Sequence, residues 1–286
     1  MADLPSPDAP SEPPPASPLG VRFNHVGLAL HRPTDLWPVM AGVLGGRFVN
    51  GGTTPSYGWT RLRFANGFMV DGFNPEGDAE SSFLGRFLAR SGVGPHHLTF
   101  VVDDLLRTVE ALRASGVEPL TDPAAPGIRE AFLRTSDGHG IVVHLIEAGQ
   151  EPPDPLDEPE GFPPLSFDRP MASLGRVVHA VADLKGALGL YKHTLGGRVV
   201  ATGSAVDGNH WVELAWEGPG RLRLLEGRHA EIAEWVGDRA GRLRHLFFNF
   251  DDPEYVPGAT KVASGRWVVQ PDAVLGTRLV LASSAR

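Results

Sequence analysis

The amino-acid sequence predicts an α+β protein made of two tandem domains of related architecture. Three observations support this prediction. The sequence LGGRFV at residues 44–49 recurs as LGGRVV at residues 195–200, 151 residues further on. Strand-like and helical segments follow one another in the same order around both copies, and such self-similarity indicates internal duplication. A stretch rich in proline and acidic residues separates the two copies and has no hydrophobic period.

We expect four segments along the 286 residues. Residues 1–19 are rich in Pro, Ser and Ala and lack the basic and apolar regions of a signal peptide, so a disordered leader is expected there. Residues 20–149 form the first predicted domain. Residues 150–170, QEPPDPLDEPEGFPPLSFDRP, are predicted to be a linker. Residues 171–286 form the second predicted domain.

The first domain contains two strand–helix–strand–strand–strand units. In the first unit we expect a strand at 23–30, a helix at 34–44 that ends at Gly45-Gly46, and strands near 47–50, 58–65 and 67–73, with Asn66-Gly67 as a hairpin turn. In the second unit we expect a strand at 97–102, an amphipathic helix at 103–115, and strands near 117–121, 129–135 and 140–147.

The composition excludes several classes of partner and chemistry. The net charge is −8 and the pI about 5.7, with no basic run, which argues against binding to nucleic acid or to an anionic membrane. No apolar stretch approaches the length of a membrane span. The chain has no cysteine, so a metal ion would need His, Asp or Glu ligands. We expect a cytoplasmic location, and the excess of arginine over lysine suggests a GC-rich bacterial genome.

Three histidines and one aspartate lie at matching places in the two units. His25 and His97 are on the opening strands, and Asp71 and His144 are on the closing strands. When two such units pair about a pseudo-twofold axis, equivalent side chains converge, as a metal site requires. A lone histidine or aspartate on a strand is more often a core or solvated residue, so the symmetry of the four carries this prediction. His96 and His139 are expected to be structural.

Two stretches of the first domain resemble methylmalonyl-CoA epimerases of the vicinal oxygen chelate superfamily. They are SSFLGRFLARSGVGPHHLTFVVDDL at 81–105 and GIREAFLRTSDGHGIVVHLIE at 127–147. The resemblance extends over residues 20–149 and more weakly over 171–286. It implies two tandem vicinal-oxygen-chelate domains, each of paired βαβββ units that form a curved mixed sheet around a cleft. It also implies one divalent metal ion (Fe, Zn, Mn, Co or Ni) bound by His25, Asp71, His97 and His144.

The sequence departs from this family at several positions. The closing ligand is usually Glu where this chain has His144, and the second is usually Gln or Glu where it has Asp71. The epimerases carry a catalytic carboxylate just after the LGG motif, whereas residues 49–58, VNGGTTPSYG, contain no acid. Epimerisation of methylmalonyl-CoA itself is therefore not expected. The equivalent positions of the second domain are Arg176, Arg223, His245 and Val280, which predicts a degenerate domain without metal.

The resemblance implies a metal-dependent enzyme that chelates a small oxygenated substrate and stabilises an enolate or oxyanion, as an isomerase, epimerase or lyase does. Tyr57 is a candidate catalytic base, and Arg129 and Trp59 are candidate substrate-binding residues. Two alternatives remain open. One is a non-haem Fe(II) dioxygenase or other oxygenase. The other is a non-catalytic drug-binding (resistance) protein that uses Trp37, Trp59 and Phe68. The expected partner is a small molecule, and the chain is expected to be a monomer, with a pseudo-dimer in one chain, or a homodimer.

Overall fold

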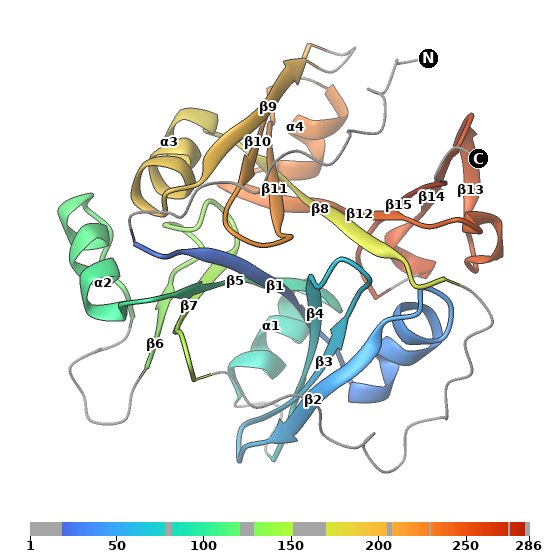
Figure 1. Ribbon diagram of the computed structural model, residues 1–286, viewed down its shortest axis with the longest axis horizontal. Helices are drawn as coiled ribbons and strands as arrows, with labels where there is room; N and C mark the ends of the chain where they lie inside the picture. Colours follow the sequence, from blue (N-terminus) through green and yellow to red (C-terminus); the bar gives the residue numbers. More distant parts are fainter. Residues whose placement is uncertain are drawn as a thin grey trace. The chain divides into compact units, whose positions relative to one another are not determined.

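The computed structural model describes residues 19–77, 82–120, 129–150, 170–204, 208–228, 230–273 and 275–283. These residues form two mixed β-sheets with few helices (Figure 1). The first sheet has seven strands in the order β2-β3-β4-β1-β5-β7-β6, and the second has eight in the order β13-β14-β15-β12-β8-β11-β10-β9. The predicted α+β class is confirmed. In the described part, no helix has the length and hydrophobicity that a bilayer span requires.

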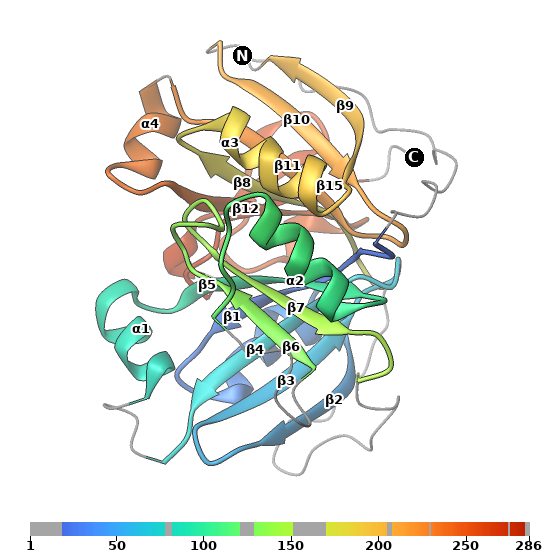
Figure 2. The ribbon, with the colours of Figure 1, turned by 90° about the vertical axis from the view of Figure 1, so that its left-hand side faces the viewer.

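The first sheet and its helices occupy the N-terminal half of the chain. Its strands are β1 (Arg22–Ala29), β2 (Arg47–Thr53), β3 (Tyr57–Arg63), β4 (Met69–Pro75), β5 (Gly94–Val102), β6 (Glu130–Leu133) and β7 (Val142–Glu147). Its α-helices are α1 (Phe83–Ser91) and α2 (Leu105–Ala114). Figure 2 shows α2 lying across β6 and β7.

The second sheet occupies the C-terminal half. Its strands are β8 (Ser173–Val181), β9 (Arg198–Ser204), β10 (His210–Ala215), β11 (Arg221–Glu226), β12 (Gly241–Asn249), β13 (Thr260–Ala263), β14 (Arg266–Val269) and β15 (Leu279–Ala282). Its α-helices are α3 (Leu184–Leu188) and α4 (Ala230–Val236). A 3-10 helix, Pro253–Tyr255, stands where the second helix of the repeat is expected.

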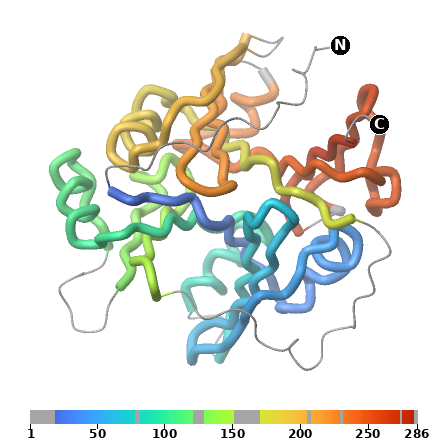
Figure 3. The backbone as a smooth tube through the Cα atoms, viewed as in Figure 1, coloured from blue at the N-terminus to red at the C-terminus, as the bar shows by residue number. Residues whose placement is uncertain are grey.

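The internal duplication extends to the strand register. Strands β2, β3 and β4 form an antiparallel meander that Figure 3 traces from blue to cyan, and β4 pairs with β1 in parallel. Strands β9, β10 and β11 form the same meander, and β11 pairs with β8 in parallel. Asp71 is opposite Gly27 in the first sheet, and Arg223 is opposite Val178 in the second. Residues two apart on a strand share a face. His25 therefore shares a face with Asp71, as Arg176 does with Arg223.

The helix predicted at 34–44 is not an α-helix. A 3-10 helix, Pro33–Leu36, continues into a π-helix, Trp37–Ala41. Pro38 has no backbone N–H, so the α-helical hydrogen bond from residue 38 cannot form. The segment instead uses wider bonds, such as Gly42 N–H to Trp37 O at 2.7 Å. The segment ends before Gly45, whose φ of +77° favours glycine.

Two further differences lie in the rest of the first domain. The strand predicted near 117–121 is absent from residues 117–120, although Leu120 N–H donates to Phe132 O at 2.8 Å, and residue 121 lies outside the described residues. Helix α1 was not predicted. Its signals are the Ser82 cap, whose side chain accepts a hydrogen bond from Gly85 N–H, and the buried Leu84 and Leu88 one helical turn apart.

The chain divides into two compact units that do not follow the linear order. One comprises Met1–Asn24, His97–Gln150 and Arg176–Arg244, and the other comprises His25–His96, Glu151–Gly175 and His245–Arg286. In the first unit, the rings of Phe23, Phe100 and Trp216 pack with centroid separations of 4.8 to 5.9 Å. In the second unit, Phe64 and Phe248 pack edge to face at 5.0 Å. Each unit thus draws its core from both sheets.

The predicted domain limits at 149 and 171 stay predictions, as does the linker, because residues 151–169 lie outside the described residues. The predicted leader also lies mostly outside them, since residues 1–18 are not described.

Candidate active site

Strands β1 and β4 bring two of the predicted metal-binding residues together. The shared face places the Nε2 atom of His25 3.2 Å from Oδ2 of Asp71. Both side chains are fully buried, at 1% and 0% exposure. A buried carboxylate needs a charged or hydrogen-bonding partner, because desolvation of an unpaired charge is costly. The Nε2 atom of His25 lies close to this carboxylate without a hydrogen bond to it.

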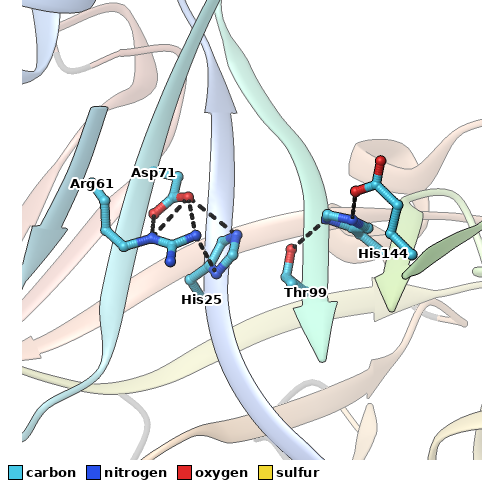
Figure 4. Close-up of polar contacts among 6 residues, drawn as sticks. His25, Arg61, Asp71, Thr99 and His144 are labelled. Carbon is cyan, nitrogen blue, oxygen red and sulfur yellow. Dashed lines mark hydrogen bonds and ion pairs between the residues drawn. The ribbon is translucent and has the colours of Figure 1, made fainter. Parts of the chain in front are cut away.

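Arg61, which the sequence analysis did not single out, is a hydrogen-bonding partner of Asp71. It lies directly opposite Asp71 in the β3–β4 hairpin. Its Nε donates to Oδ1 at 2.8 Å, and its Nη2 donates to Oδ2 at 2.8 Å. The same Nη2 is 3.4 Å from Nδ1 of His25 (Figure 4). The loop between the strands has three residues, 65–67, with Gly67 at φ of +86° and its N–H bonded to Phe64 O at 2.8 Å. The predicted two-residue turn at Asn66-Gly67 would have paired residue 61 with residue 72 instead.

His144 on β7 has a carboxylate partner that the sequence analysis also missed. Its Nε2 lies 2.9 Å from Oε2 of Glu130 on β6, and its Nδ1 lies 3.3 Å from Oγ1 of Thr99 on β5 (Figure 4). The ring of Phe132 stacks on the imidazole at 4.4 Å, with an interplanar angle of 6°. The hydrogen bond to His144 lowers the pKa of Glu130 below its usual value. The result is an oriented imidazole beside an ionised, half-exposed carboxylate.

His97 on β5 is buried, and its ring meets that of His144 edge to face, with centroids 5.8 Å apart. The neighbouring His96 packs on the rings of Phe83 and Phe87, as expected of a structural residue. His139 lies in a turn with φ of +56°, and its carbonyl oxygen accepts a hydrogen bond from Nε2–H of His179 at 2.8 Å.

The three weaker candidates lie in different surroundings. Tyr57 and Trp59 are on β3. Because side chains alternate along a strand, residues 57, 59 and 61 share one face. The rings of Tyr57 and Trp59 are 6.2 Å apart, and Tyr57 also contacts Phe73 and Phe83. The Nη1 group of Arg129 donates to Oε2 of Glu147 at 2.7 Å. Arg129 is thus paired within the chain, and its role in binding a substrate stays a prediction.

Solved structures show which known fold this chain shares. A mutant of 4-hydroxymandelate synthase from Streptomyces coelicolor is similar with a TM-score of 0.65 and 15% identity, over 95% of this chain and 94% of that one. The chain has the vicinal oxygen chelate fold. Two shorter matches each cover 46% of this chain. Methylmalonyl-CoA epimerase from Mycobacterium tuberculosis has a TM-score of 0.40 and 24% identity over 89% of its chain. A hypothetical protein from Bacillus halodurans has a TM-score of 0.41 and 20% identity over 97% of its chain. No family model matches the sequence, and no curated protein matches it.

The side chains that this vicinal oxygen chelate fold presents fit a divalent cation in their donor chemistry. Imidazole nitrogen and carboxylate oxygen are the donors that zinc, iron and manganese accept. Two atoms bound to one ion at about 2.1 Å are roughly 3 Å apart, and His25 Nε2 and Asp71 Oδ2 are 3.2 Å apart. The pairing of His144 with Glu130 matches the carboxylate that commonly orients a metal-bound histidine. Among the described residues, no three or more His, Asp or Glu form a metal-holding group, so the four-residue centre stays a prediction.

The second copy of the vicinal oxygen chelate unit carries different charges at the same positions. The strand registers make Arg176, Glu213 and Arg223 the equivalents of His25, Arg61 and Asp71. Arg176 Nη1 and Arg223 Nε both donate to Oε2 of Glu213 at 2.8 Å. A guanidinium group has no lone pair to offer a cation. The carboxylate and the guanidinium have thus exchanged strands between the two copies.

Proposed function

We propose that this chain is a metal-dependent enzyme that acts on a small oxygenated molecule, with His25, Asp71, His97 and His144 as ligands of one divalent cation. Iron, zinc, manganese, cobalt and nickel are the candidate ions. The observation that carries the proposal is the buried His25–Asp71 pair, with donor atoms 3.2 Å apart at the positions that the repeat predicts. The proposal for His97 and His144 rests on their equivalent places in the second strand–helix–strand–strand–strand repeat of the first domain.

A divalent cation held there would act as a Lewis acid toward a substrate oxygen. The chain's own residues prepare its ligands. Arg61 places a counter-charge beside Asp71 and fixes the plane of its carboxylate through two donated hydrogen bonds. Glu130 fixes the ring of His144, and Phe132 holds that ring flat from one side. Oriented ligands of this kind are what tune a bound metal.

Glu130 is our candidate for the proton-transfer group. The sequence offers no acid after the LGG motif, and the side chain of Glu130 is 47% exposed, so a substrate can reach it. The hydrogen bond to His144 lowers the pKa of Glu130, which keeps this carboxylate ionised at neutral pH and makes it a weaker base than an ordinary glutamate. Removal of a proton next to a carbonyl group is the step that isomerases, epimerases and lyases share. We propose this reaction class, with Tyr57 as the second candidate base.

The oxygenase hypothesis keeps one specific observation in its favour. A set of histidines with one carboxylate, as in His25, His97 and Asp71, is the ligand type of non-haem iron oxygenases. The drug-binding hypothesis is weakened, because Trp37 and Phe68 are 2% and 1% exposed and belong to the core, which leaves only Trp59 of its three aromatic residues.

The test is elemental analysis of the full chain purified without oxygen, beside His97→Ala and the matched control His245→Ala. We expect close to one equivalent of metal in the wild type and in His245→Ala, and strong loss in His97→Ala. Zinc, manganese, cobalt or nickel would support the isomerase or lyase class, and iron would support the oxygenase. Equal metal content in the wild type and His97→Ala, or none in either after reconstitution, would overturn the proposed centre.

A further inference from the structure

Four arginines gather on one face of the second sheet, around the single carboxylate of Glu213. Ala215 on β10 pairs with Arg198 on β9 and with Arg221 on β11, so these arginines share a face. Glu213 pairs with Arg223. Glu213 is two positions from Ala215 on β10, and Arg223 is two positions from Arg221 on β11. The same face therefore continues to Glu213 and Arg223. The hydrogen bond from Arg176 to Glu213 adds the fourth arginine, from β8.

The carboxylate of Glu213 is shared by two of these arginines. Arg176 and Arg223 both donate to its Oε2 atom, and their side chains are only 16% and 15% exposed. Burial acts to raise the pKa of Glu213, but the two guanidinium charges hold that pKa below its usual value. The indole ring of Trp211 lies 3.8 Å from the guanidinium carbon of Arg223 and fixes its plane. Glu213 is thus paired with Arg176 and Arg223 through its Oε2 atom.

The other two arginines have no acidic partner in the part of the chain that the structure describes. Arg221 Nη1 donates only to the neutral carbonyl groups of Gly218 and Gly220, both at 3.0 Å. Burial and the nearby charge of Arg198 lower the pKa of Arg221, while Glu213 partly offsets them. Arg198 is exposed, whereas Arg221 is half-buried. A half-buried guanidinium group with no carboxylate bonded to it directly is stabilised when an anion joins it.

The first sheet carries less positive charge at the equivalent positions. By register, Arg47, Arg61, Arg63 and Met69 are the equivalents of Arg198, Glu213, Ala215 and Arg221. With neutral histidine, the six positions of the first sheet carry three arginines and one aspartate, a charge of +2. The same positions of the second sheet carry four arginines and one glutamate, a charge of +3.

We propose that this face of the second sheet binds an oxyanion, the carboxylate or phosphate group of a small molecule, through Arg198 and Arg221 with Arg176 and Arg223 behind them. Guanidinium groups suit this ligand, because their planar forks donate two parallel hydrogen bonds to such oxygens. The site is separate from the proposed metal centre and does not depend on it. It also gives the second domain a role of its own.

The test is calorimetric titration of the full chain at low ionic strength with two probes, inorganic phosphate and acetate. The variants are Arg198→Gln and Arg221→Gln, and the matched control is Arg47→Gln, the equivalent arginine of the first copy. We expect one probe to bind the wild type and Arg47→Gln equally. We expect the affinity to fall about tenfold or more in the other two variants, since a charged hydrogen bond is worth roughly one such factor. The probe that binds tells phosphate from carboxylate.

Arg198 is exposed, so its replacement is expected to leave the fold intact, which circular dichroism checks. Failure of both probes to bind the wild type at millimolar concentration would overturn the proposal. An equal affinity in Arg198→Gln and Arg47→Gln would also overturn it, because that result means a nonspecific charge effect. The metal content of the same samples tests the proposed metal centre separately.

Discussion

Arg61 and Asp71 lie directly opposite each other on β3 and β4, and the guanidinium group of Arg61 donates to both carboxylate oxygens of Asp71. The two side chains are 8% and 0% exposed. In the second sheet, Glu213 and Arg223 occupy the same two positions with the charges reversed. The duplicated fold therefore keeps a buried ion pair across this strand pair in both copies, whichever strand carries the carboxylate. This relationship leads to the first two predictions.

Replacement Asp71→Asn is expected to destabilise the protein strongly. It removes the counter-charge of a buried guanidinium group, and breaking one side of a buried ion pair costs about 3–5 kcal/mol. The measurement is the free energy of unfolding from urea denaturation at neutral pH. The control is Glu147→Gln, which breaks the pair with Arg129, 57% exposed, and should change the free energy by less than about 1 kcal/mol. Similar small losses in both variants would contradict the buried pair.

Replacement Arg61→Gln is expected to raise the affinity for a divalent cation. Arg61 orients Asp71, and loss of such an outer partner typically weakens metal binding by 10- to 100-fold. It also places a fixed positive charge beside the proposed ion, and one pair of unit charges 4 Å apart near a protein surface is worth about 4 kcal/mol. Repulsion between Arg61 and a doubly charged ion is larger still, so we expect this repulsion to outweigh the loss of Asp71 orientation.

Competition between the protein and a chelator for Zn²⁺ or Mn²⁺ measures this effect. We expect a gain of at least tenfold in Arg61→Gln and no change in Arg47→Gln, whose arginine is exposed on β2. A weaker affinity in Arg61→Gln would show that Arg61 supports the ion by orienting Asp71 and does not oppose it.

Much of the strand framework was predictable, because strand patterns and turn chemistry are local. The turn at Asn66-Gly67 was predictable, but the β3–β4 register was not, because the loop has three residues and pairs Arg61 with Asp71. The parallel pairing of β1 with β4 then places His25 and Asp71 on one face. The repeat of LGGRFV and LGGRVV indicated the duplication that the registers of the two sheets now show. The π-helix at Trp37–Ala41 was not predictable from hydrophobic period, because so short a segment does not distinguish α-helical from π-helical hydrogen bonds. The second copy has a π-helix at Gly189–Thr194 without a proline.

The partners of the candidate residues were harder to predict than the residues themselves. Glu130 reaches His144 diagonally, since the residue paired with His144 is Phe132. Such a contact depends on the twist of two strands and on a side-chain rotamer, neither of which leaves a sequence pattern. Arg61 was not deducible, because the predicted two-residue turn pairs residue 61 with residue 72 and not with Asp71. A buried arginine also contradicts the usual expectation that charged residues on strands face solvent.

The pair of Glu130 and His144 gives a prediction at low pH. The pKa of Glu130 is lowered in the folded state, so its contribution to stability is present above the usual value of 4.5 and is lost as the pH falls through the folded pKa. Glu130→Gln should therefore lower the free energy of unfolding at pH 7 and have no effect below the folded pKa. The glutamate is half exposed, so we expect a loss of at most about 1 kcal/mol. A loss that stays the same across this range would contradict the charged hydrogen bond.

His179 gives a prediction for a higher pH range, with a larger change in the free energy of unfolding. It is fully buried on β8, and burial lowers its pKa to about 4, although its hydrogen bond to the carbonyl oxygen of His139 acts to raise it. Between pH 6.5 and 4 the unfolded chain binds this proton and the folded chain does not, so stability falls as the pH is lowered through that window. The slope from one such group is at most about 1.4 kcal/mol per pH unit. His179→Gln keeps a donor for His139 and should flatten the fall in unfolding free energy, whereas the exposed His193→Gln should leave it unchanged. Equal slopes in the wild type and His179→Gln would show that His179 does not titrate differently in the two states.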